Sequence, residues 1–269
     1  MKISLVESSP FSIFSITDLF SDSLLQSLSK EYPPNSLFDL EDTTNKKRFG
    51  DHTQTAFENF VQDNRNYKLF YERITSDEFV SCILNALSDT DELKFLRIGQ
   101  SKILRKSPFE FIIRTKSRFA KRFKLRIGYE FSLMQSGSHL APHTDSASKL
   151  LSILVFLPSK SELDGNISKK IGTQFWKAND KSSVFPNWNS ALLKEIELNK
   201  FYQTHECFLQ LPFTEAKHYG FCKSDVSWHS VQHVQEGLSR KSINITFWIS
   251  ESRQHKRQFS KSNSSGQIL

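Results

Sequence analysis

Residues 240–249 alternate between two kinds of side chain with a period of two. One set is Arg240, Ser242, Asn244, Thr246 and Trp248, and the apolar set between them is Ile243, Ile245, Phe247 and Ile249. Successive side chains of a strand point to opposite faces of a sheet, so this pattern predicts a strand with one polar and one oily face. Two interpretations are open: an edge strand whose polar face meets water, or a strand whose polar face lines a ligand cavity. Arg240 and Ser242 on such a face can together bind a carboxylate, as the cavity interpretation requires.

Strand signals dominate the chain from about residue 100 onward. Residues 150–157 form a nearly continuous apolar run that ends at Pro158, which is typical of a strand covered on both faces. Residues 127–134 alternate larger apolar residues with small or polar ones. Helical patterns occur earlier, over residues 21–31 and 79–87. The sequence therefore predicts a mainly β protein with flanking helices.

The length of 269 residues suits one β-rich domain with a sizeable core. We expect this domain over residues 1–252, with a helical part over about 1–100 and a β core over about 101–252. Residues 253–269 are polar and basic, which predicts a disordered tail. No apolar stretch approaches the roughly 20 residues that cross a bilayer, and the start has no signal-peptide pattern. With three sparse cysteines that form no Cys-x-x-Cys pair, the expected location is the cytoplasm.

The chain has a net charge of +7, from 36 Lys and Arg against 29 Asp and Glu. Part of this charge lies in the tail and part in a cluster over residues 114–126, where Phe119 and Phe123 are interleaved. The basic members of the cluster are Arg114, Lys116, Arg118, Lys121, Arg122, Lys124 and Arg126. Such a cluster can contact phosphates or an acidic polymer, but most of them are solvated faces. Nucleic acid is therefore not the expected partner.

His143 and Asp145 stand two positions apart, so an extended chain places both on one face, about 6–7 Å from each other. A His-x-Asp pair is a weak signal by itself because it often occurs by chance. Here a second histidine, His229, lies in a β-prone run, and Arg240 follows about ten residues later. Two histidines and one carboxylate hold Fe(II) from one side and leave its other positions open, as in non-haem oxygenases. These three residues are the candidate metal ligands.

These residues resemble the pattern of the Fe(II)/2-oxoglutarate-dependent dioxygenase superfamily, nearest to its prolyl-4-hydroxylase-like branch. The family pattern is His-x-Asp, a distal His, and an Arg or Lys about ten residues on, and this chain has all four in that order. Residues 137–143 are similar to the family's approach to the first ligand. Residues 172–175 resemble the short strand between the two halves of its metal site. The resemblance covers roughly residues 124–250.

The resemblance implies a double-stranded β-helix, or jelly-roll, core and an Fe(II)- and 2-oxoglutarate-dependent hydroxylase. His143, Asp145 and His229 then bind Fe(II), and Arg240 with Ser242 binds the distal carboxylate of 2-oxoglutarate. The branch often carries tyrosines upstream of the first ligand, and Tyr129 is the candidate for their place. Dioxygen is consumed, a substrate C–H bond is oxidised, and succinate and CO2 are released, with ascorbate as a reductant. The substrate stays open: a protein side chain, a sugar or lipid precursor, or a small metabolite.

Two other classes of protein stay open. A cupin-like metal-binding protein uses the same triad without 2-oxoglutarate, and Arg240 at its spacing argues against this class. A non-catalytic binding protein on the same fold is expected to lack a ligand, whereas all three are present here. Nucleic-acid demethylases of the superfamily are expected to carry a second arginine six residues after the first, where this chain has Thr246.

Overall fold

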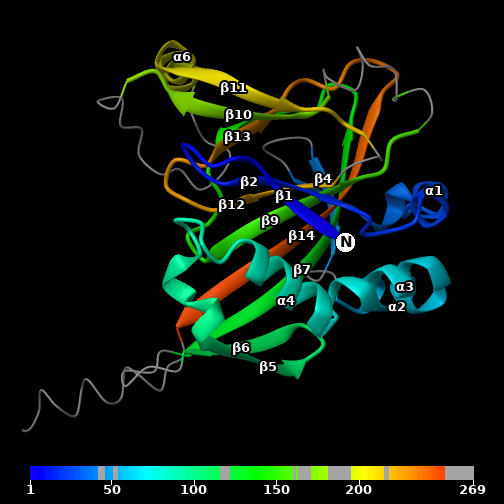
Figure 1. Cartoon of the computed structure of the whole chain (residues 1–269). Coiled ribbons are helices and arrows are strands. Elements are labelled where there is room, and N and C mark those ends of the chain that lie inside the picture. The colour runs from blue at the N-terminus through cyan, green and yellow to red at the C-terminus, as the bar shows by residue number, and fades with distance from the viewer. Residues whose placement is uncertain are drawn as a thin grey trace, which may run out of the picture.

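Figure 1 shows the computed structural model of the chain, in which two β-sheets face one another and helices cover one side. The structure describes residues 1–41, 46–50, 54–115, 122–159, 162, 171–180, 195–214 and 218–251. The expected tail over residues 253–269 lies outside these described residues, as do Lys116, Arg118 and Lys121 of the basic cluster.

The larger sheet contains ten antiparallel strands, eight of them in one continuous order and two attached at β7. The continuous order is β1 (Lys2–Glu7), β2 (Ile13–Thr17), β12 (His218–Cys222), β9 (Lys149–Phe156), β14 (Ser239–Glu251), β7 (Arg122–Gln135), β4 (Lys46–Gly50) and β3 (Asp39–Glu41). The attached strands are β6 (Glu110–Thr115), which pairs with β7, and β5 (Ser101–Ser107), which pairs with β6.

The smaller sheet has the order β11 (His205–Leu211), β10 (Thr173–Ala178), β13 (Trp228–Val231) and β8 (Leu140–His143), again antiparallel. Its buried side chains pack into one apolar cluster with those of the larger sheet: Phe175 and Val231 from the smaller sheet meet Phe156 and Phe221 from the larger. Two antiparallel sheets packed face to face form a sandwich. The predicted mainly β, double-stranded β-helix core is confirmed.

Helices cover the outer face of the larger sheet (Figure 1). These helices are α1 (Asp22–Lys30), α2 (Gln54–Asp63), α3 (Arg65–Ile74) and α4 (Asp77–Ala86). Three short 3-10 helices also occur: η1 (Asn35–Leu37) after α1, and η3 (Lys94–Leu96) and η4 (Ile98–Gln100) after α4. A further helix, α6 (Glu195–Thr204), leads into β11. Helix α1 begins where expected, because the Ser21 hydroxyl accepts a hydrogen bond from the amide of Leu24 as an N-cap. The first 100 residues therefore supply helices α1 to α4, and they also supply four strands of the larger sheet.

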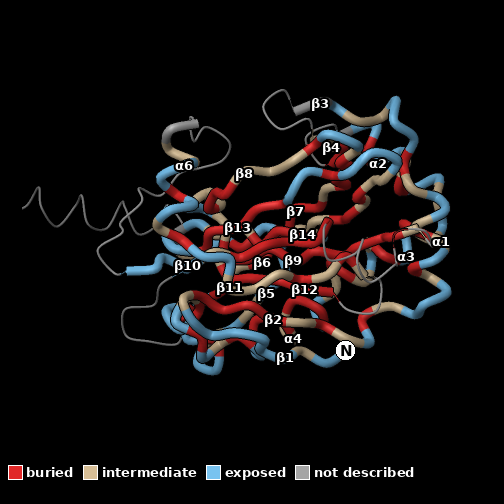
Figure 2. Tube along the Cα trace, turned by 90° about the horizontal axis from the view of Figure 1, so that it is seen from above, coloured by how far each residue is buried: buried red, intermediate tan, exposed pale blue. Residues whose placement is uncertain are grey.

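The strand predicted from the alternation is β14, and it lies inside the larger sheet, between β7 and β9. The edge-strand interpretation is therefore wrong. Ile243, Ile245 and Phe247 are fully buried under the helices on the outer face. Figure 2 shows β7, β9 and β14 as a buried central layer. Since the apolar face of β14 meets the helices, its polar face points into the space between the two sheets.

Candidate metal centre and co-substrate pocket

The three candidate ligands meet at one end of the space between the sheets. His143 ends β8 and lies directly opposite His229 on the neighbouring strand β13, with 4.2 Å between the ring centroids. Asp145 follows two residues after His143, beyond the end of β8. One ligand atom from each of the three residues lies within 4.8 Å of the other two. Antiparallel pairing of β8 with β13 thus brings together residues that are far apart in sequence.

Backbone carbonyls fix which ring nitrogen of each histidine faces the centre. His143 Nδ1 lies 2.8 Å from the carbonyl oxygen of Ala141, and His229 Nδ1 lies 3.0 Å from that of Ser227. A carbonyl oxygen only accepts, so each Nδ1 must carry the proton and donate it, which leaves the Nε2 lone pair for a metal. The pKa of both rings is lowered, mainly by burial, and that of His229 falls to about 3. Both histidines are therefore neutral at pH 7, the form that binds a metal.

Asp145 is held by two side chains that the sequence did not single out. Its carboxylate accepts hydrogen bonds from the Lys149 ammonium at 2.7 Å and from the Ser152 hydroxyl at 3.1 Å. Burial alone would raise the pKa of this carboxyl, but Lys149 and His229 outweigh burial and hold the pKa well below its usual range. Asp145 is thus an oriented, ionised oxygen ligand. Lys149 stands four positions after Asp145 in the sequence, but its contact with Asp145 depends on how the chain turns into β9, which the sequence did not predict.

Arg240, near the start of β14, is a buried cation with only part of its donors satisfied. Its side chain is 4% exposed, one guanidinium nitrogen donates to Thr173 Oγ1 at 3.0 Å, and the guanidinium carbon lies 4.9 Å from the centre of the Phe156 ring. Its buried Nε has no hydrogen-bond partner, and no carboxylate of the described residues pairs with it. Burial lowers the pKa of this guanidinium to about 10, so it stays protonated at neutral pH. A buried unpaired charge costs several kcal/mol, which an incoming carboxylate would offset.

The structure places the Ser242 hydroxyl beside Asn244, and the hydroxyl that contacts the Arg240 guanidinium belongs to Thr173. Ser242 is fully buried on the same face of β14, but its hydroxyl donates to Asn244 Oδ1 at 3.2 Å. Thr173, and not Ser242, is the hydroxyl residue that contacts Arg240. The signal for Thr173 was present, because it lies in the segment 172–175 that resembles the family's short strand.

The expectation that Tyr129 contacts the co-substrate needs correction. Tyr129 lies in β7 along the wall of the cavity, but its ring packs on the other face of the strand, against Phe57, Phe70 and Phe131 at centroid distances of 5.1, 5.6 and 5.2 Å. Side chains at odd positions of β7 point to the helices, whereas Glu130 and its even-numbered neighbours line the cavity. Tyr129 is a core residue beneath α2 and α3.

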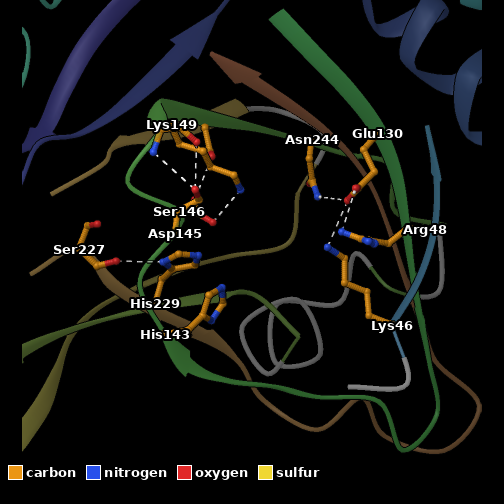
Figure 3. Close-up of polar contacts among 12 residues, drawn as sticks. Lys46, Arg48, Glu130, His143, Asp145, Ser146, Lys149, Ser227, His229 and Asn244 are labelled. Carbon is orange, nitrogen blue, oxygen red and sulfur yellow. Dashed lines mark hydrogen bonds and ion pairs between the residues drawn. The ribbon is translucent and has the colours of Figure 1, made fainter. Parts of the chain in front are cut away.

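One cavity of about 200 Å³ contains both halves of the site. The three candidate ligands line it together with Arg240 and Thr173. The wall also carries Arg126 and Asn244, and four charged residues that the sequence analysis did not single out: Lys46, Arg48, Glu130 and Lys149. Figure 3 shows the triad with Lys149 facing the group of Lys46, Arg48, Glu130 and Asn244 across the site.

The chain is similar in fold to several solved structures. The epimerase SnoN, solved with Fe3+, alpha ketoglutarate (2-oxoglutarate) and nogalamycin RO, aligns with a TM-score of 0.50 at 9% identity, over 89% of this chain and 80% of its own. The chain has the fold of the 2-oxoglutarate-dependent oxygenases. A Pseudomonas putida prolyl-4-hydroxylase aligns with a TM-score of 0.49 at 10% identity, over 89% of this chain and 94% of its own. HygX from Streptomyces hygroscopicus, with nickel and 2-oxoglutarate bound, aligns with a TM-score of 0.43 at 12% identity, over 88% and 83%. No family model matches the chain, and no curated protein matches it in sequence.

The described part of the chain contains one group of histidine and carboxylate side chains arranged so that they could hold a metal ion, and it is the triad. His233, the histidine most easily mistaken for a ligand, instead stacks on His139 with 4.2 Å between the rings. Among the described helices, none is long and apolar enough to span a membrane.

Proposed function

We propose that this chain is a non-haem oxygenase that depends on Fe(II) and 2-oxoglutarate, with His143, Asp145 and His229 as the metal ligands. The observation that carries the proposal is that one cavity holds both a two-histidine, one-carboxylate cluster and a buried arginine that lacks a carboxylate partner among the described residues. The first feature fits Fe(II), and the second fits an anionic co-substrate.

The donor set fits the metal on chemical grounds. Each histidine presents a neutral Nε2, and Asp145 presents an ionised carboxylate whose orientation is fixed by Lys149 and Ser152. Two imidazoles and one carboxylate on one side of the ion leave positions open for further ligands. The same hydrogen bonds that orient the ligands keep them in place before the metal arrives.

The other end of the cavity fits the distal carboxylate of 2-oxoglutarate. In our proposal Arg240 donates to this carboxylate through its unpaired Nε, and the Thr173 hydroxyl supports the guanidinium or donates alongside it. The rings of Phe156 and Phe213 lie 4.9 and 6.0 Å from the guanidinium carbon and exclude water from this contact. Ion pairs are stronger in such an apolar surrounding than in water.

Bound Fe(II), 2-oxoglutarate and dioxygen would supply the oxidising chemistry, which converts 2-oxoglutarate to succinate and CO2 while a substrate C–H bond is oxidised. The protein's part is to hold the ligands, to orient the co-substrate by its distal carboxylate and to position the substrate. We propose hydroxylation as the reaction, by analogy with the prolyl-4-hydroxylase-like branch. The proposal treats residues 1–252 as one catalytic domain.

Succinate release tests this function. Purified protein supplied with Fe(II), 2-oxoglutarate, ascorbate and air should form succinate slowly even without its substrate, and chelation of the iron should stop the reaction. His143→Ala and His229→Ala should abolish succinate formation, whereas His233→Ala should retain it. Succinate formation that persists in both ligand variants would disprove the assigned metal site.

A further inference from the structure

The wall of the cavity carries more positive than negative charge. The described residues that line it include five cations and two carboxylates: Lys46, Arg48, Arg126, Lys149 and Arg240, against Glu130 and Asp145. In the proposed function Arg240 binds the distal carboxylate of 2-oxoglutarate, so the co-substrate does not account for Lys46, Arg48 and Lys149 in the wall of the same cavity.

Glu130 gathers two of these cations at one place. Its carboxylate lies 3.3 Å from the Lys46 ammonium and 3.6 Å from the Arg48 guanidinium, and it accepts a further hydrogen bond from Asn244 at 3.4 Å. Burial would raise the pKa of Glu130, but Lys46 and Arg48 outweigh burial and lower the pKa. Glu130 is therefore ionised, and it holds two cations, Lys46 and Arg48, at the wall of the cavity.

Lys149 supplies a second cation on the metal side of the same space. Its ammonium lies 2.7 Å from Asp145 and 5.3 Å from the centre of the Trp248 ring. Lys149 and Lys46 both line the cavity that His143 and His229 line. Figure 3 shows the two groups on opposite sides of the site.

We infer that the substrate of this oxygenase carries an anionic group, a phosphate monoester or a carboxylate, that binds between the Lys46–Arg48 pair and Lys149. The inference rests on the proposed function, since it assigns the substrate class of the same site. Lys46, Arg48 and Lys149 all line the cavity that contains the triad. Arg48, with 41% of its side chain exposed, can bind the anion bidentately from the rim.

A paramagnetic probe experiment tests the inference without knowledge of the substrate. The full chain is loaded with Mn(II) and 2-oxoglutarate in the absence of iron, and nuclear relaxation is measured for methylphosphonate (31P), acetate (1H) and the neutral dimethyl sulfone (1H). Probes that bind near the metal relax faster, with a saturable dependence on concentration. We expect saturable enhancement for methylphosphonate, acetate or both, and none for dimethyl sulfone. The stronger of the two anions identifies a phosphate or a carboxylate substrate.

Two variants should change the probe affinity in opposite directions. In the triple variant Lys46→Gln, Arg48→Gln, Glu130→Gln, the anion loses two charge-assisted contacts and no buried charge is left unpaired, so its dissociation constant should rise about tenfold or more. Glu130→Gln alone removes the competing carboxylate, so the dissociation constant should fall. General structural damage would weaken binding in both variants. Lys177→Gln, on the surface beside Glu206, is the control and should match the parent protein.

Three outcomes overturn the inference. They are no enhancement of either anion above dimethyl sulfone, equal anion affinity in the parent and triple variant, and weaker binding in Glu130→Gln. The second outcome would mean that the anion binds the metal directly and not the cations. Failure of the proposed function is detected separately by comparing Mn(II) binding in the parent protein and in His229→Ala. If the proposed metal site is wrong, the two proteins will bind Mn(II) equally.

Discussion

Arg240 is the residue whose substitution separates co-substrate binding from metal binding. In Arg240→Gln the distal carboxylate loses a charge-assisted contact worth about 1.5–3 kcal/mol, so the dissociation constant of 2-oxoglutarate should rise about tenfold to a hundredfold. Affinity for Fe(II) or Mn(II) should not change, because Arg240 is not a ligand. Calorimetric titration of the Mn(II)-loaded protein measures both constants. An unchanged constant for 2-oxoglutarate would show that another residue anchors it.

The same substitution should not destabilise the metal-free protein. The guanidinium is buried without a carboxylate partner among the described residues, so its removal relieves a cost of burial. Urea denaturation of Arg240→Gln should therefore give an unfolding free energy at least equal to that of the parent. A large loss of stability would mean that weakened 2-oxoglutarate binding reflects damage to the fold.

His218, on β12, makes folding sensitive to acid. Burial lowers the pKa of His218 to about 4 from its ordinary value of 6.5. Between these values the unfolded chain binds a proton that the folded protein does not, so stability is lost as the pH falls through this window. From pH 7 to pH 4.5 this side chain should lower the unfolding free energy by about 2–3 kcal/mol. Urea denaturation at both pH values should show a smaller fall for His218→Leu than for the parent; equal falls would refute the assignment.

At the scale of elements, β7 has two faces with different tasks. Its even-numbered side chains line the cavity and its odd-numbered ones pack under α2 and α3. Tyr129 belongs to the packed face, and its buried hydroxyl has no hydrogen-bond partner. Since an unpaired buried hydroxyl is costly, Tyr129→Phe should raise the unfolding free energy by about 1 kcal/mol and leave 2-oxoglutarate affinity unchanged. Weaker 2-oxoglutarate binding in this variant would show that the Tyr129 hydroxyl does contribute to the co-substrate site.

The sequence predicted elements that have a local pattern, and it missed site residues whose position depends on the pairing of distant strands. The alternation in β14 and the apolar run of β9 are local patterns, and both strands were predicted because period and composition are visible in a single segment. Lys46 and Arg48 were missed because they reach the cavity only through the pairing of β4 with β7, about 85 residues away. Tyr129 was misassigned because the face that it occupies depends on this pairing and on the helices above it.

At the scale of the whole molecule, the site joins the two sheets. The proposed metal ligands come from β8, β13 and the turn after β8, whereas Arg240 comes from the larger sheet. Metal and 2-oxoglutarate should therefore each stabilise the folded state by mass action, by about 2.7 kcal/mol per ligand at a hundredfold excess over its dissociation constant. For a chain of this size each ligand should raise the melting temperature by about 5–10 °C. Thermal denaturation with and without both ligands measures the shift, and Asp145→Ala should show none.

The measurement that tests the central claim most directly is an anaerobic titration of the metal-free protein with Fe(II) and 2-oxoglutarate, followed by visible absorption. A 2-oxo acid chelated to Fe(II) gives a weak metal-to-ligand charge-transfer band. Our account predicts that this band appears only with both components, saturates at one equivalent of iron, and disappears in His229→Ala. Folded protein that binds iron but gives no band would contradict the account and favour a metal site that does not use 2-oxoglutarate.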